Sequence, residues 1–147
     1  MAITQAVANS FKKELLEGDH DFTQTTGDKF KLALYTSAAT LNSSTTAFTS
    51  TNEVAASGQY VSGGGALVNT GTSVASGVAI TNFSNLSFTG VTITARGALI
   101  YNTSATVSNA AVAVLDFTTD KTATDGTFTI QFPSFTTSAA ILRIGNA

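Results

Sequence analysis

The start of the chain has a helical pattern of apolar residues. Ile3, Val7, Phe11 and Leu15 follow one another at intervals of four, which places them on one face of a helix over residues 1–18. Two roles are open to such a helix: it docks on a neighbouring subunit as an arm, or it covers one end of its own β-domain. In the first case we expect Phe11 and Leu15 to make interface contacts.

The rest of the chain, residues 19–147, has the alternating pattern of β-strands and is expected to form a single domain. Phe30, Leu32 and Leu34 occupy every second position, so their side chains point to one face of a strand. Short runs recur at intervals of about 8–12 residues between turn-forming residues, as in a β-sandwich or barrel. The later strands are expected at residues 66–69, 73–80, 86–89, 91–94, 98–101, 111–117, 127–132 and 139–144.

Two segments of this pattern predict particular structural elements. Residues 111–117 are nearly all apolar, which predicts a central strand buried on both faces. Asp125 and Gly126 are a typical pair for a hairpin turn immediately before the next strand. The hydrophobic core is expected to be built from Leu32, Leu34, Ile93, Leu99, Val112, Val114, Phe128, Ile130 and Leu142.

Residues 37–65 form a long region of small and polar residues. A structureless loop of that length is unusual inside a compact domain. We therefore expect short edge strands near residues 53–55 and 59–62. If the region is instead a true loop, it is the best candidate for a contact surface.

The middle of the chain is nearly free of charge. From Thr36 to Leu115, 80 consecutive residues include only two charged ones, Glu53 and Arg96. A free domain normally spreads mixed charges over its surface, and an enzyme needs titratable groups in a cleft. The pattern indicates β-structure that packs against other subunits, and an enzyme with a catalytic site is not expected.

Glu53 and Arg96 are therefore candidate interface residues. In one interpretation they form a salt bridge between subunits. In the other, Arg96 pairs within its own subunit or is a solvated charge that blocks strand addition at a sheet edge. The sequence alone leaves both open.

Few residues offer a chemical site. The chain has no cysteine, a net charge of −2 and no basic stripe, so thiolate metal sites and nucleic-acid binding are not expected. The only histidine, His20, is flanked by two aspartates and is expected in a solvated turn after the helix. Asp116, Asp120 and Asp125 are a weak candidate for a calcium site through oxygen ligands, although their spacing is not that of an EF-hand. No cofactor is expected.

Several segments resemble small structural proteins of tailed bacteriophages. They are MAITQAVANSFKKELLEGDHDF, GDKFKLALYTSAATL, TNEVAASGQYVSGG, TARGALIYN and AVAVLDFTTDKTATDGTFTIQFP, and together they cover most of the chain. The resemblance implies a multi-copy virion protein without enzymatic activity. It carries over no site residues, because the segments contain no catalytic or binding motif.

These lines together favour a capsid decoration, or cement, protein. The expected fold is all-β, a β-sandwich of jelly-roll or related type with one N-terminal helix. The expected partner is the major capsid protein, bound by a homotrimer on the capsid exterior after synthesis in the bacterial host cytoplasm. No contact with nucleic acid or membrane is expected. The alternatives are a neck, tail or fibre component of the virion, and a host-receptor or glycan-binding module.

Overall fold

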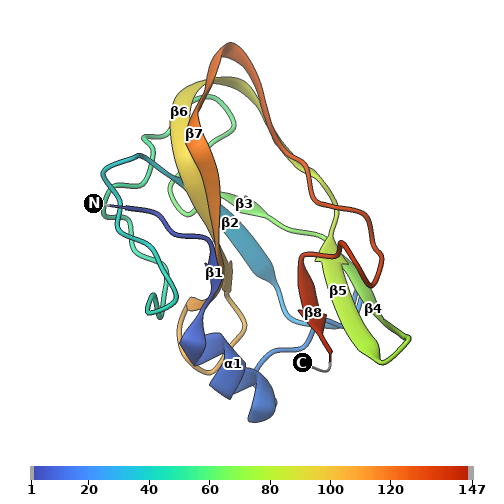
Figure 1. Ribbon diagram of the computed structural model, residues 1–147. Helices are drawn as coiled ribbons and strands as arrows, with labels where there is room; N and C mark the ends of the chain where they lie inside the picture. Colours follow the sequence, from blue (N-terminus) through green and yellow to red (C-terminus); the bar gives the residue numbers. More distant parts are fainter. Residues whose placement is uncertain (1, 146–147) are drawn as a thin grey trace.

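The computed structural model describes residues 2–145 and contains two antiparallel sheets and one short helix, α1 (Figure 1). The larger sheet has the strand order β1-β7-β6-β2-β3, and the smaller has the order β4-β5-β8. Met1 and residues 146–147 of the expected β-domain lie outside the described residues. The elements are β1 (Ala6–Val7), α1 (Asn9–Leu16), β2 (Phe30–Tyr35), β3 (Gly65–Ala66), β4 (Asn69–Ala75), β5 (Val78–Phe83), β6 (Leu86–Asn102), β7 (Ala110–Ile130) and β8 (Leu142–Ile144).

A long hairpin of β6 and β7 dominates the larger sheet. The five short strands expected between residues 86 and 132 merge into these two, because their turn-like residues are bulges instead of turns. Gly90 and Asp125 both have positive φ, at 63° and 46°, and lie where the register of the pair shifts or next to it. The hairpin turn predicted at Asp125 and Gly126 is therefore wrong. A bulge and a turn both need left-handed residues, so composition alone does not separate them.

The predicted helix over residues 1–18 is shorter in the structure. α1 includes only Asn9–Leu16, and Ala6 and Val7 pair with β7 as the edge strand β1. Ile3 lies in an extended segment and forms a parallel bridge with Leu41. A spacing of four residues fits one face of a helix and also one face of a strand, which explains the error. The end of the helix agrees with its sequence, because Gly18 has a φ of 78° and its N–H bonds to the carbonyl of Leu15.

The small sheet also differs from the expected strands. The strand predicted over residues 73–80 is a hairpin, in which β4 ends at Ala75 and β5 begins at Val78. Its two turn residues, Ser76 and Gly77, have φ values of 53° and 76°, as a two-residue hairpin turn requires. The last strand, β8, is confined to Leu142–Ile144.

The two edge strands predicted in the region 37–65 do not form. Near both positions the chain makes only isolated bridges, one between Tyr35 and Glu53 and one between Ser57 and Tyr60. Residues 36–64 are a loop whose backbone hydrogen-bonds to the N-terminal segment at Thr4, to the start of β7 at Ala111 and to β2 at Leu34. We call it the covering loop.

The core agrees with the alternating pattern. All the core residues predicted from the sequence are buried and belong to one hydrophobic cluster. A row of aromatic rings connects the two sheets: Phe30 of β2 lies 5.5 Å from Phe83 of β5, which lies 5.7 Å from Phe132. The strand predicted to be buried on both faces over residues 111–117 is so only as far as residue 114, because residues 115–117 are partly exposed. The all-β class is thus confirmed.

Candidate functional site

Three features of the structure bear on function: the covering loop, an open groove beside α1 and a buried polar cluster around His20. They contain most of the residues that the sequence indicated, and the structure assigns several of these residues to new partners.

The covering loop is held in place by all three tyrosines. The hydroxyl of Tyr35 donates to the carbonyl of Thr49 at 2.6 Å, and that of Tyr101 donates to the carbonyl of Gly63 at 2.6 Å. Burial raises the pKa of Tyr101 to about 12, so this hydroxyl keeps its proton at neutral pH. Tyr60 is fully buried, with its ring at 5.0 Å from that of Phe88.

Glu53 is the acceptor at the centre of this loop. Its carboxylate accepts hydrogen bonds from the hydroxyl of Tyr60 at 2.8 Å, the hydroxyl of Ser62 at 2.9 Å and the N–H of Gly63 at 2.7 Å. The hydroxyl of Tyr60 in turn accepts the N–H of Leu34 in β2 at 2.8 Å. Burial raises the pKa of Tyr60, and the neighbouring carboxylate raises it further. Glu53 therefore stabilises the covering loop of its own subunit, and its role as an interface residue stays a prediction.

Arg96 also has its partner inside the subunit. Its Nε lies 3.6 Å from a carboxylate oxygen of Asp116, on the neighbouring strand β7. The pair is partly exposed, so its contribution to stability is small. The structure thus shows the second interpretation of Arg96, a pair within its own subunit, and the intersubunit salt bridge to Glu53 stays a prediction.

The three aspartates proposed as a calcium site do not come together. Asp116 and Asp120 lie on β7 on either side of Thr118, which has a φ of 66° and lies where the register with β6 shifts. Asp116 also accepts the N–H of Thr118, and Asp125 occupies a bulge. Within residues 2–145, no group of three or more His, Cys, Asp or Glu side chains is placed to hold a metal ion.

The predicted interface residues of the helix face inward. Phe11 is only 4% exposed, and its ring packs on those of His20 at 4.7 Å and Phe22 at 5.9 Å. Leu15 is partly buried against the same core. The helix thus covers one end of its own domain, and Phe11 is a core residue instead of a docking residue.

An apolar groove of about 870 Å³ lies between α1 and the small sheet. We call it the α1 groove. Its exposed apolar rim is formed by Leu16, which is 91% exposed, and Ile144, which is 60% exposed. Ile144 pairs with Ala79, which pairs with Val74, so the apolar row continues across the small sheet. The groove is also lined by Val7, Phe11, Lys12, Leu15, Gly18, His20, Asp21, Phe22, Thr23, Thr72, Ala79, Ile80, Thr81, Leu142, Arg143 and Gly145.

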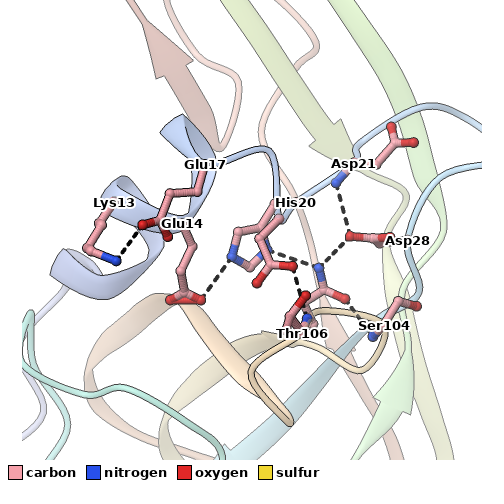
Figure 2. Close-up of polar contacts among 10 residues, drawn as sticks. Lys13, Glu14, Glu17, His20, Asp21, Asp28, Ser104 and Thr106 are labelled. Atoms are coloured by element: carbon pink, nitrogen blue, oxygen red, sulfur yellow. Dashed lines mark hydrogen bonds and ion pairs between the residues drawn. The ribbon is translucent and has the colours of Figure 1, made fainter.

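The polar cluster around His20 connects α1 to the end of β6 (Figure 2). Nδ1 of His20 lies 2.9 Å from the amide nitrogen of Asn102, and Nε2 lies 3.4 Å from a carboxylate oxygen of Glu14. The Asn102 amide nitrogen also donates to Asp28 at 2.7 Å, and its oxygen accepts the N–H of Ser104 at 2.7 Å. These two partners fix the orientation of the amide, so Nδ1 of His20 is an acceptor and the proton of the neutral ring is on Nε2.

This cluster corrects the solvated turn expected for His20. The imidazole side chain is fully buried, and both ring nitrogens face side chains of the fold. A catalytic histidine must reach its substrate, and this geometry leaves none of the ring to do so. Asp19 next to it accepts the N–H of Thr106 at 2.9 Å, which lowers the pKa of Asp19. The cluster therefore has a structural role: it connects the helix to the loop after β6. We call it the His20 joint.

Replacing Asn102 by aspartate tests this joint. We expect the free energy of unfolding at pH 7 to fall by about 3 kcal/mol, because a second carboxylate then faces Asp28 where an amide donates now. The loss relative to wild type should shrink as the pH falls towards 4, since protonation of either carboxyl restores a donor. Urea unfolding of wild type and variant at several pH values measures this difference in the free energy of unfolding.

Replacement of Asn102 by alanine is the control, because it removes the donor to Asp28 without placing a second carboxylate beside it. Its loss of stability relative to wild type should depend less on pH than that of the aspartate variant. An equal and pH-independent loss in both variants would contradict the placement of Asp28 beside Asn102.

The chain matches no protein-family model, no curated protein and no solved structure in the three comparisons that we made. In the described part of the chain, no helix has the length and apolar character needed to cross a membrane. The functional assignment consequently depends on the chain's own surfaces.

Proposed function

We propose that this chain is a non-enzymatic structural protein of a tailed-phage virion, bound to the outside of the shell as a capsid decoration protein. The observation that carries the proposal is the covering loop, residues 36–64. Its only charged residue, Glu53, is hydrogen-bonded within the subunit. The sequence resemblance to phage structural proteins supports the same assignment. The finer fold class, a β-sandwich of jelly-roll type, stays a prediction.

The covering loop has the properties of a preformed contact surface. Its backbone is fixed by the hydroxyls of Tyr35, Tyr60 and Tyr101, so binding does not have to order it. Its exposed residues are mostly Ser, Thr, Ala, Asn and Gly. Removing these side chains from water costs less free energy than removing charged ones. The exposed part of β7, by contrast, includes Asp120, Lys121 and Asp125 and is suited to remain in water.

Decoration would stabilise the shell by mass action. A protein that binds the assembled shell but not the separated capsid subunits shifts the equilibrium towards the intact particle, by an amount that grows with its free concentration relative to its Kd. Many identical weak contacts of this kind need a rigid surface on each copy and do not need a catalytic site.

The number of copies in a purified virion tests the proposal most directly. Quantitative mass spectrometry against the major capsid protein is expected to give hundreds of copies at a fixed ratio to the shell subunit. About a dozen copies would instead indicate a neck, tail or fibre component. Absence from the particle would overturn the virion assignment and leave a receptor- or glycan-binding module, although all three tyrosines are buried and unable to stack on sugars.

A charge placed on the covering loop should weaken binding to the shell. Thr51→Lys and Ala56→Lys are expected to raise the Kd for undecorated shells about tenfold or more, because an unpaired ammonium group would lose its water in the contact. Co-sedimentation of the purified variants with shells measures the change.

Thr124→Lys is the matched control, since Thr124 is an exposed residue of β7 outside the proposed contact. It should bind like wild type. Equal binding by all three variants would place the contact on another surface of the protein.

A further inference from the structure

The α1 groove is an apolar surface that is left open by residues 2–145. Leu16 is 91% exposed at the end of α1, and Ile144 and Val74 are 60% and 71% exposed on the small sheet. Figure 1 shows α1 and the small sheet at the same end of the molecule. An apolar strip that extends over two elements is typical of a surface that binds another protein.

We infer that the α1 groove binds a second copy of this chain, with Leu16 of one copy entering the groove of the next. The inference deepens the proposed homo-oligomer and rests on the proposed function. It assigns the contact between copies to a surface other than the covering loop, which is left free for the shell.

The charges at the groove point to this occupant. Lys12 and Arg143 both line it, and neither forms an ion pair within residues 2–145. Lys12 only approaches the side chain of Asn9 at 3.4 Å, and Arg143 donates to a backbone carbonyl. The groove therefore fits a segment in which an apolar side chain is next to an acidic one.

The end of α1 is such a segment. Leu16 has the largest exposed fraction among the exposed large apolar residues described, and Glu17 follows it directly. Glu17 bonds to Lys13 on its own helix at 2.6 Å, but its side chain is still 54% exposed and open to a second cation. In the inferred contact, Leu16 lies in the neighbour's groove and Glu17 pairs with the neighbour's Lys12. Such a head-to-tail contact forms a ring only where the rotation between copies closes, as the expected homotrimer requires.

The positive charge of Lys12 and the negative charge of Glu17 make the contact between copies specific for one register. Lys12 and Glu17 are five residues apart, so they do not face each other on the same helix, where neighbours are three or four residues apart. Lys12 has no ion-pair partner within residues 2–145, and Glu17, although paired with Lys13, is exposed enough to meet a second cation from the neighbouring copy. Like-charge contacts would form if the helices met in another register, which disfavours wrong arrangements.

Sedimentation velocity on the purified chain over a range of concentrations tests the inference without any capsid. Wild type is expected to associate into a discrete oligomer, and Leu16→Glu and Ile144→Glu are each expected to weaken the association at least tenfold. Val61→Glu is the matched control, because Val61 is 56% exposed and does not line the groove. It should associate like wild type.

A charge exchange tests the occupant itself. Lys12→Glu and Glu17→Lys should each weaken association, and the double variant should recover most of it, because the two reversed charges meet between copies and not within one helix. Far-UV circular dichroism checks that α1 persists in each variant.

Several results would overturn the inference: a monomeric wild type at every concentration, unchanged association in both groove variants, or no recovery in the double variant. A monomer that carries a bound apolar small molecule in native mass spectrometry would also overturn it, by showing a ligand pocket. Because these measurements use the protein alone, their failure is distinct from the failure of the copy-number test on virions.

Discussion

Replacing Gly64 by alanine is expected to lower the free energy of unfolding by about 4 kcal/mol or more. Gly64 has a φ of 78°, and a Cβ there would overlap the backbone carbonyl of Leu32 in β2. The substitution thus combines left-handed strain with a collision between two backbone segments. Either β2 or the end of the covering loop has to move. Urea unfolding followed by circular dichroism measures the loss.

Gly77 is the matched control for this substitution. Its φ of 76° is nearly the same, but a Cβ there meets no atom within 4 Å. Gly77→Ala should therefore cost only the left-handed strain, about 1 kcal/mol. An equal loss at the two positions would show that the covering loop does not approach β2 as closely as the structure has it.

Replacing Tyr60 by alanine is expected to cost about 3–5 kcal/mol. The ring is fully buried against Phe88, and its hydroxyl connects the N–H of Leu34 to Glu53. The substitution opens a cavity, removes one of the three donors to the Glu53 carboxylate and releases the middle of the covering loop. Equilibrium unfolding gives the energy, and hydrogen exchange over residues 36–64 gives the local effect.

Tyr60→Phe separates the two contributions. It keeps the ring and removes the hydroxyl, so it should cost only about 1–3 kcal/mol, mostly from the unsatisfied N–H of Leu34. A loss below 1 kcal/mol for the alanine variant would contradict the role of Tyr60 as the anchor of the loop.

The core was predictable because it depends on a local pattern. Leu32 and Leu34 are buried on one face of β2, as their alternation predicts, but Ala33 and Tyr35 on the opposite face are buried as well. Strand ends were less predictable. Gly90 and Asp125 have the composition of turns, and only the pairing of β6 with β7 shows that they are bulges.

The partners of polar residues were not predictable, because they come from distant parts of the chain. His20 and Asn102 are 82 residues apart in sequence and 2.9 Å apart in the structure. Arg96 was matched with Glu53 because both lie in the charge-poor segment. Its actual partner, Asp116, is the first residue after that segment. The α1 groove, likewise, exists only once α1 and the small sheet have come together.

The strand order of the larger sheet has a consequence for how the chain is made. β1 pairs with residues 113–114, and β2 pairs with β6 at residues 97–102, so both early strands wait for partners that are synthesised much later. At about 5–20 residues per second, a ribosome needs roughly 5–20 s to reach β7 after it has made β1. Until β6 emerges, the apolar strand β2 has only the two-residue strand β3 as a partner. A cell that produces this protein in large amounts must therefore keep many incomplete chains from associating through β2 before β6 emerges.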